Sequence, residues 1–150
     1  MSLTIKKIET FPIAVPLKSP FKTALRTVTT ASSLIVRLTD SDGFTGLGEA
    51  APTAPITGDT SASIKFAVEQ VIAPKLIGAS LNQPERVKQI IDTALVGNHS
   101  PKAAVNIAVN DLLAKHYGVS LSEWLGGYRQ TISTDYTVSV GTAAEMVGHA

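Results

Sequence analysis

The chain has 150 residues, 44% of them hydrophobic and 17% charged, a composition that can bury one substantial hydrophobic core. Its 13 basic and 12 acidic residues leave a formal net charge of +1, which argues against nucleic acid or an anionic membrane as a partner. The absence of cysteine excludes disulfides and thiolate metal sites, and the first residues lack the long apolar run of a signal peptide, so we expect a cytoplasmic protein.

The first half of the chain shows the alternating pattern of β-strands. The first predicted strand covers residues 4–17, where Pro12 and Pro16 favour a position at a sheet edge because proline cannot donate a ladder hydrogen bond. Two further strands are predicted at residues 33–38 and 44–49, joined by a turn whose Asp-Gly pair is typical of hairpins. We therefore expect an antiparallel meander of three strands.

Two segments at either side of this hairpin have a different composition. Residues 18–32 and 50–59 are rich in Pro, Thr, Ser and Gly and show no regular hydrophobic period. Each is predicted to be irregular and is long enough to act as a flap.

After Asp59 the hydrophobic period changes from that of a strand to that of a helix. The third predicted helix is apolar around much of its circumference and is expected to be the most buried. The fourth begins with a Ser-x-x-Glu capping box and ends at paired glycines. The predicted helices run from Thr60 to Pro74, from Asn82 to Leu95, from Ser100 to Tyr117 and from Ser120 to Gly127.

The C-terminal residues begin a different kind of unit. Residues 131–140 are predicted to form a strand, and Thr142 and Glu145 are spaced as a capping box that opens a helix. A strand that leads directly into a helix is typical of a parallel sheet or a β/α barrel, which needs neighbouring strands. We therefore expect a fragment of a longer enzyme, with an α+β domain at residues 1–128 and the first strand and helix start of a truncated barrel at residues 129–150.

Several short motifs are spread over nearly the whole chain. They are Pro20-Phe21-Lys22-Thr23-Ala24-Leu25-Arg26-Thr27, Gly46-Leu47-Gly48-Glu49-Ala50-Ala51-Pro52, Ile56-Thr57-Gly58-Asp59, Ala103-Ala104-Val105 with Asn110-Asp111-Leu112, Trp124-Leu125-Gly126-Gly127, and Thr134-Asp135-Tyr136-Thr137-Val138-Ser139-Val140. Together they resemble the N-terminal capping domain of the enolase superfamily, in its muconate-lactonizing branch, and most closely that of the dipeptide epimerases. The Gly-x-Gly-Glu and Leu-Gly-Gly motifs indicate the branch, and the Arg26 loop, the Ile-Thr-Gly-Asp loop and the last motif indicate dipeptide epimerases. The sequence departs from many relatives at Val119, where they carry a proline after the glycine, a difference confined to a turn.

The resemblance implies a division of labour in the intact enzyme. The capping domain would cover the C-terminal mouth of a modified TIM barrel and supply substrate specificity, while the barrel supplies the chemistry. The implied reaction is a Mg²⁺-assisted 1,1-proton transfer on a dipeptide through an enolate, with one lysine removing the α-proton and a second lysine returning a proton to the opposite face.

These implied lysines and the Mg²⁺ ligands belong to later barrel strands. No catalytic or metal-binding residue is therefore expected in this chain, which we expect to be inactive alone although the intact protein would be an isomerase. The expected partner of the intact enzyme is a small-molecule dipeptide. We also expect a homo-oligomer, because the terminal strand would expose two unpaired edges.

The resemblance implies four substrate-binding residues. Arg26, flanked by small or apolar residues, would grip a substrate carboxylate through paired hydrogen bonds, whereas composition alone favours a surface arginine. Ile56 would form an apolar wall of the specificity pocket, with Thr57 in the same loop. Thr137 would present its hydroxyl at the barrel mouth, although β propensity alone explains a threonine there equally well. Asp59 is predicted instead to cap the following helix.

Other polar residues are expected to have structural roles. Glu49 and Asp111 are predicted to make capping or packing hydrogen bonds, and Lys22 to be a solvated loop charge. Trp124 is predicted to be a core anchor between cap and barrel. The histidines lack ligand spacing and a carboxylate partner in the sequence, so they are not expected to form a metal site.

Alternatives to the epimerase remain open. A muconate cycloisomerase or an o-succinylbenzoate synthase of the same branch would carry the same kind of capping domain. A different class is a stand-alone, non-catalytic α+β interaction module. A reading frame that continues after Ala150 with a Lys-x-Lys motif would support an enzyme, and the absence of any continuation would support the module.

Overall fold

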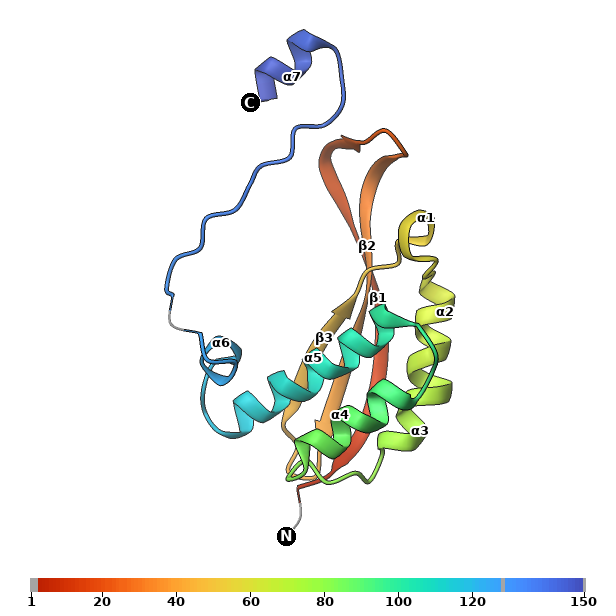
Figure 1. Cartoon of the computed structure of the whole chain (residues 1–150), viewed down its shortest axis with the longest axis vertical. Helices are drawn as coiled ribbons and strands as arrows, with labels where there is room; N and C mark the ends of the chain where they lie inside the picture. Colours follow the sequence, from red (N-terminus) through yellow and green to blue (C-terminus); the bar gives the residue numbers. More distant parts are fainter. Residues whose placement is uncertain (1–2, 128, 150) are drawn as a thin grey trace. The chain divides into compact units, whose positions relative to one another are not determined.

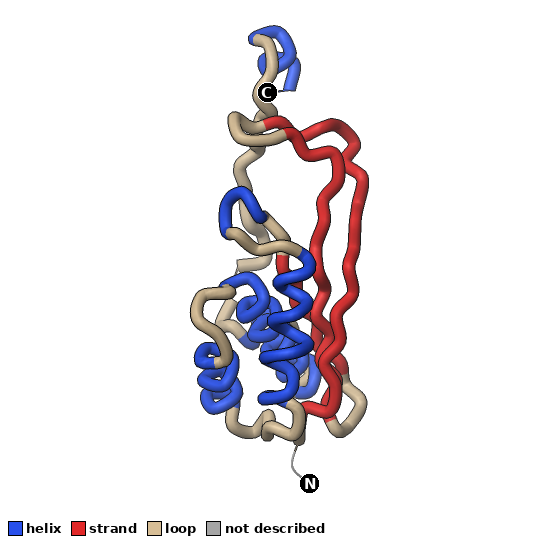
Figure 2. The backbone as a smooth tube through the Cα atoms, turned by 90° about the vertical axis from the view of Figure 1, so that its right-hand side faces the viewer, coloured by secondary structure: helices blue, strands red, loops and turns tan. Residues whose placement is uncertain are grey.

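The structure, a computed structural model, describes residues 3–127 and 129–149. It combines an antiparallel sheet of strand order β1-β2-β3 with helices that cover one face of that sheet (Figures 1 and 2). The predicted α+β class with a three-stranded meander is confirmed. The chain divides into two compact units, Met1–Ile13 with Ser33–Tyr128 and Ala14–Ser32 with Arg129–Ala150. The domain boundary predicted at residue 128 falls on a residue outside the described part of the chain.

The sheet consists of β1 (Ile5–Lys22), β2 (Thr27–Asp40) and β3 (Thr45–Ala50). The alternation along β2 places Leu34, Val36 and Leu38 in the core, each at most 1% exposed. β1 lies at the edge of the sheet, as its prolines predicted. The predicted Asp-Gly turn between β2 and β3 is also present, with Gly43 at φ +89°, a conformation that favours glycine.

The prediction of an irregular first flap is wrong. Residues 18–32 are not irregular, because β1 and β2 continue through them and meet in a tight turn where the Thr23 N–H donates to the Arg26 carbonyl at 2.9 Å. The abundance of Thr and Ser was interpreted as a loop signal. β-branched residues also favour strands, and pairing between the two strands satisfies the backbone groups of both.

The glycines of β3 set the distance between the sheet and its central helix, α5 (His99–His116). A Cβ atom added at Gly48 would overlap the carbonyl oxygen of Ala104, and one added at Gly46 would overlap that of Ala108. Any side chain at these two positions would force the helix away from the sheet. The sequence pattern gave no structural reason for these two glycines; close packing against α5 is that reason.

The first long helical stretch combines α2 (Ser61–Phe66), a π-helical segment η1 (Ala67–Ile72) and α3 (Ala73–Leu76). The prediction that Pro74 ends this helix is wrong, because helical structure continues to Leu76. The widened turn before the proline explains the difference: the N–H of Ala73 donates to the carbonyl of Val68, five residues back. A π turn shifts the hydrogen-bond partners and accommodates a residue that lacks a donor.

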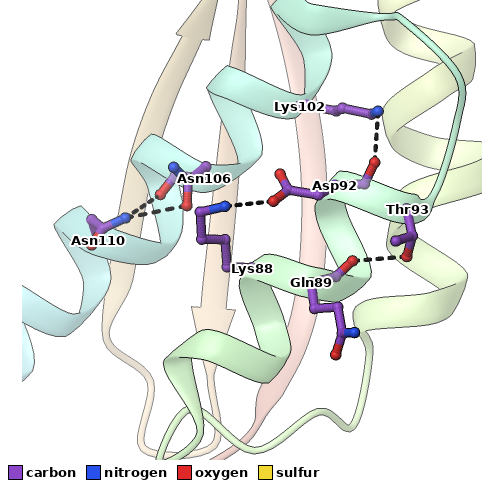
Figure 3. A network of polar contacts seen from close by, with 7 residues as sticks. All are labelled: Lys88, Gln89, Asp92, Thr93, Lys102, Asn106 and Asn110. Atoms are coloured by element: carbon purple, nitrogen blue, oxygen red, sulfur yellow. Dashed lines mark hydrogen bonds and ion pairs between the residues drawn. The ribbon is translucent and has the colours of Figure 1, made fainter.

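Two further helices, α4 (Pro84–Thr93) and α6 (Leu121–Trp124), pack against α5. α5 buries Ala104, Val105, Ala108 and Leu112, as expected for the most buried helix. α4 is linked to α5 by polar contacts, including the Lys102 ammonium donating to the Asp92 carbonyl at 2.8 Å (Figure 3). None of the described helices is both long enough and apolar enough to cross a membrane.

Trp124 on α6 is an anchor of this core. Its ring packs partly buried against the core cluster and stacks on Tyr117 with a centroid distance of 5.4 Å. Its indole N–H donates to the Asn110 side-chain oxygen at 2.9 Å, which satisfies the polar end of an otherwise apolar ring. The capping box that begins α6 is present as predicted, between Ser120 and Glu123.

The C-terminal segment differs from the prediction in one respect. Residues 131–140 form no strand: a strand needs a ladder of backbone hydrogen bonds along its length, and this segment is joined to β1 only near its end, where the Val140 N–H donates to the Lys22 carbonyl. The predicted helix is present as α7 (Ala143–His149). Its capping box is formed as expected, since the Thr142 N–H donates to the Glu145 carboxylate at 2.8 Å and Glu145 N–H donates to the Thr142 hydroxyl at 3.3 Å.

A pH-dependent contribution to stability is expected from Glu9 on β1. Lys7 lies 2.6 Å and Arg37 2.8 Å from its carboxylate oxygens, and the hydrogen bonds from Lys7 and then Arg37 hold the pKa of Glu9 below its ordinary value of 4.5. A lowered pKa stabilises the fold above pH 4.5, and this stabilisation is lost as the pH falls through the pKa of the folded state. The effect is small because the cluster is at the surface.

The test compares wild type with Glu9→Gln in urea denaturation. Wild type is expected to be the more stable protein at about pH 7, and the difference should be smaller at about pH 3, because the stabilisation is lost as the pH falls through the lowered pKa of Glu9 in the folded state. A difference of equal size at both pH values would show that the carboxylate charge does not contribute.

Candidate functional site

Arg26 occupies the turn between β1 and β2. The Thr23 hydroxyl organises this turn: it accepts hydrogen bonds from the N–H groups of Leu25 at 3.3 Å and Arg26 at 3.2 Å. The Arg26 side chain is half-buried, and no carboxylate of the described residues forms an ion pair with its guanidinium. A fixed backbone and a guanidinium without an internal partner are suited to binding a carboxylate ligand.

Ile56 and Thr57 lie on α1 (Ala54–Thr57), a short helix in the second predicted flap. Gly58 ends this helix at φ +79°, a left-handed conformation that favours glycine. Ile56 is 66% exposed, so its apolar side chain is accessible to a ligand or to another protein surface. The Thr57 hydroxyl donates to the Thr53 carbonyl at 3.3 Å, so part of its hydrogen-bonding capacity is used within the loop.

Asp59 does not cap the following helix, contrary to the prediction. Thr60 is the N-cap of α2, and its side chain and that of Ser63 form the capping box. Asp59 is buried instead, 8% exposed, and its carboxylate accepts a hydrogen bond of 2.5 Å from the Ser100 hydroxyl at the start of α5. Because Ser100 is 41 residues from Asp59 in the sequence, no local pattern predicts this hydrogen bond.

Thr137 belongs to the extended C-terminal segment, where its side chain is exposed. Neighbouring residues of that segment contact β1 within the second unit: the Val140 N–H donates to the Lys22 carbonyl at 3.0 Å, and the Lys22 N–H donates to the Ser139 hydroxyl at 3.3 Å. This unit contains a cavity of about 170 Å³. Its lining residues are Ser19, Pro20, Lys22, Tyr136, Ser139, Val140, Gly141 and Glu145.

The four predicted substrate-binding residues fall into two pairs. Ile56 and Thr57 are neighbours on α1 in the first unit, and Arg26 and Thr137 belong to the second unit. Neither Arg26 nor Thr137 lines the cavity of the second unit. Sequence reasoning missed the role of Thr23 in holding the turn, although a threonine a few residues before the end of a tight turn is a recognisable signal for such a hydroxyl.

Asp111 and Glu49 make structural hydrogen bonds, as predicted. Asp111 accepts hydrogen bonds from the Leu47 N–H and from the Lys115 ammonium, both at 2.7 Å, and thereby links α5 to β3. Glu49 accepts a hydrogen bond of 2.5 Å from the Ser33 hydroxyl across the sheet. Among the described residues no three His, Cys, Asp or Glu side chains are grouped to hold a metal ion, so they do not fit a Mg²⁺ site. The side chain of His149 lies outside the described part of the chain.

The structure contains a sheet covered by helices, an arginine in the β1–β2 turn and the short exposed helix α1. A comparison of the sequence with known protein families assigns this chain to one of them. Residues 6–126 match the family described as "Mandelate racemase / muconate lactonizing enzyme, N-terminal domain". The chain therefore belongs to this family and contains its N-terminal domain, which confirms the resemblance to the enolase superfamily.

Within this family, the chain is similar to L-Ala-D/L-Glu epimerases. The L-Ala-D/L-Glu epimerase of Bacillus subtilis (strain 168) is 51% identical over 148 residues, which cover 99% of this chain and 40% of that protein. The solved substrate-liganded complex of the L-Ala-D/L-Glu epimerase from Bacillus subtilis matches with a TM-score of 0.93 at 52% identity, covering 97% of this chain and 40% of that one.

Two further relatives are a dipeptide epimerase and a cycloisomerase. The dipeptide epimerase from Cytophaga hutchinsonii, solved in complex with Mg and the dipeptide D-Ala-L-Val, matches with a TM-score of 0.86 at 37% identity and covers 99% of this chain and 40% of that one. The chloromuconate cycloisomerase of Delftia acidovorans is 32% identical over 151 residues, covering 99% of this chain and 40% of that protein. The chain thus spans about 40% of the length of the relatives it matches.

Proposed function

We propose that this chain is the N-terminal, specificity-determining part of a dipeptide epimerase, an isomerase of the L-Ala-D/L-Glu type. The observation that carries the proposal is the 51% identity to the Bacillus subtilis epimerase over 99% of the chain. The chain's own chemistry supports it, because the Arg26 guanidinium, which forms no ion pair with a carboxylate of the described residues, can bind an acidic side chain, and Ile56 offers an exposed apolar surface.

In this proposal the residues of the chain bind and orient the substrate. Arg26 pairs with the side-chain carboxylate of the C-terminal glutamate through two parallel hydrogen bonds. Ile56 forms an apolar wall, and Thr57 and Thr137 contribute polar contacts to the dipeptide. Removing water from around the Arg26 pair would strengthen it and select a glutamate over an uncharged residue.

The proposal assigns proton transfer and metal binding to residues outside this chain. The described residues provide no ligand set for Mg²⁺. The Cytophaga hutchinsonii relative was solved with Mg and a dipeptide, which supports Mg²⁺ as the cofactor of the intact enzyme.

A second candidate function is a muconate-type cycloisomerase. It is favoured by the 32% identity to the chloromuconate cycloisomerase of Delftia acidovorans. A diacid could also pair with Arg26, so the arginine alone does not separate the two reactions. We rank the cycloisomerase second because the identity to the epimerase is higher.

The test uses the protein expressed from its whole reading frame and supplied with Mg²⁺. It should convert L-Ala-L-Glu into L-Ala-D-Glu, measured by chiral chromatography, with a kcat/KM well above that for L-Ala-L-Leu. It should leave cis,cis-muconate unchanged. Lactone formation from muconate without dipeptide epimerisation would favour the cycloisomerase instead.

The chain of 150 residues by itself is expected to show neither epimerisation of L-Ala-L-Glu nor specific Mg²⁺ binding, because the proposal places the base and the metal ligands elsewhere. Isothermal titration with Mg²⁺ and a day-long incubation with the dipeptide measure both properties. Saturable Mg²⁺ binding, or a D-glutamyl product formed by this chain, would contradict the assignment of catalysis to other residues.

A further inference from the structure

The loop that carries Ile56 has few points of attachment to the core. Residues 51–63 are fully described, and Asp59 is the only buried residue among them. Ala50 precedes this loop at 2% exposure, and Ile64 follows it as a fully buried residue. Helix α1 itself buries none of its residues. The position of Ile56 therefore depends on how the two ends of the loop are held.

A chain of hydrogen bonds connects Asp59 to both sides. The Ser100 hydroxyl on α5 donates to the Asp59 carboxylate at 2.5 Å. The Asp59 N–H donates to the Thr57 hydroxyl at 3.3 Å, and this hydroxyl donates to the Thr53 carbonyl at 3.3 Å. The end of α1 is thereby tied to the first turn of the most buried helix.

The environment of Asp59 explains why this contact resists breaking. A buried carboxylate that loses its hydrogen-bond donor is strongly disfavoured. The N-terminus of α5 also carries a partial positive charge, and its N-cap residue Asn98 makes no side-chain capping bond. Asp59 supplies a negative charge at this helix start, from a different part of the chain.

We propose that the Asp59–Ser100 pair is a positioning clasp for the substrate-specificity loop, an inference that rests on the proposed function. Asp59 and Ser100 touch no substrate; they act through Ile56 and Thr57 by fixing α1 on α5. Loosening the clasp leaves the reacting groups in place and makes the apolar wall mobile. Binding of the dipeptide is then weakened more than the chemical step.

The experiment uses the protein from its whole reading frame and the variants Ser100→Ala, Ser100→Thr and Asp59→Asn. Ser100→Ala removes the donor, Ser100→Thr retains a hydroxyl, and Asp59→Asn retains an acceptor without the charge. Ser33→Ala is the matched control, because it breaks a serine–carboxylate hydrogen bond of the same length, 2.5 Å to Glu49, that joins β2 to β3 and does not involve α5. Amide hydrogen exchange and kinetics with L-Ala-L-Glu are measured for each protein.

For Ser100→Ala we expect faster exchange of the amides of Ile56, Thr57 and Gly58, whose hydrogen bonds close α1, while Leu112 in the middle of the core stays protected. KM should rise about tenfold with kcat nearly unchanged, in line with the loss of one hydrogen bond to a charged group. Ser100→Thr should keep the exchange rates and KM of wild type, and Asp59→Asn should give values between those of wild type and Ser100→Ala. Ser33→Ala should change neither the exchange of α1 nor KM.

Unchanged exchange in α1 of Ser100→Ala would overturn the clasp, and so would a fall in kcat at constant KM. If the wild-type protein does not epimerise dipeptides, the proposed function fails, and hydrogen exchange alone decides the clasp. Faster exchange confined to α1 then supports it, and exchange equal to that of wild type overturns it.

Discussion

Gly48→Ala is expected to lower the free energy of unfolding by about 1–3 kcal/mol, or to prevent folding. The added Cβ would overlap the carbonyl oxygen of Ala104 and lie 2.9 Å from the Ala108 nitrogen, and both atoms belong to the backbone of α5. A helix backbone cannot turn aside as a flexible side chain can, so α5 must move away from β3. That movement would disrupt the hydrogen bond from the Leu47 N–H to Asp111 on α5.

Urea denaturation followed by circular dichroism measures this effect. Gly148→Ala is the matched control, because a Cβ at Gly148 in α7 meets nothing within 4 Å. The control should be neutral or slightly stabilising, since alanine favours helices over glycine. Equal unfolding free energies for the two variants would mean that β3 and α5 do not pack as closely as described.

Arg26→Ala in the whole protein is expected to reduce kcat/KM for L-Ala-L-Glu by an amount equivalent to about 2–5 kcal/mol, the usual cost of removing one partner from a desolvated charge pair. kcat/KM for L-Ala-L-Leu should change little, because its side chain offers no carboxylate. Arg26→Lys should recover only part of the loss, since a single ammonium cannot form the two parallel hydrogen bonds of a guanidinium.

Arg37→Ala is the control for this experiment. Arg37 pairs with Glu9 on the sheet and lies over the ring of Phe11. Its substitution therefore removes the same charge from the protein as Arg26→Ala does, without changing a residue of the turn between β1 and β2. It should leave the preference for L-Ala-L-Glu intact. If Arg26→Ala lowers kcat/KM equally for both dipeptides, the arginine binds the main-chain carboxylate or supports the loop, and it is not the selector of the side chain.

Features with a local cause were predictable from the sequence. The β2–β3 turn follows from an Asp-Gly pair, and the start of α6 follows from the spacing of Ser120 and Glu123. The high burial of α5 follows from apolar residues around its circumference. In each case the residues that determine the structure are within a few positions of one another.

Features with a distant cause were not predictable. Residues 18–22 and 27–32 form strands because the two segments pair, and residues 131–140 form none because no strand pairs with them along their length. The continuation of the helix past Pro74 has a local cause, the widened turn before it, which the hydrophobic period does not indicate.

The same distinction holds for the candidate site. The residue type of Arg26 and the apolar character of Ile56 were readable in the sequence through the resemblance to dipeptide epimerases. The hydrogen bond between Asp59 and Ser100, which holds the loop of Ile56, could not be predicted from the sequence, because it joins residues 41 positions apart. A carboxylate beside a helix start was interpreted as a cap, and only the fold shows that its partner is on a different helix.

Exchange of the α-proton tests the central claim most directly. The whole protein with Mg²⁺ is incubated with L-Ala-L-Glu in deuterated water, and the ¹H signal of the glutamate α-proton is followed by NMR. A dipeptide epimerase removes that proton and returns one from solvent, so the signal should disappear while the alanine α-proton is retained. Retention of both signals over many hours, with protein whose fold is verified by circular dichroism, would contradict the assignment of this chain to a dipeptide epimerase.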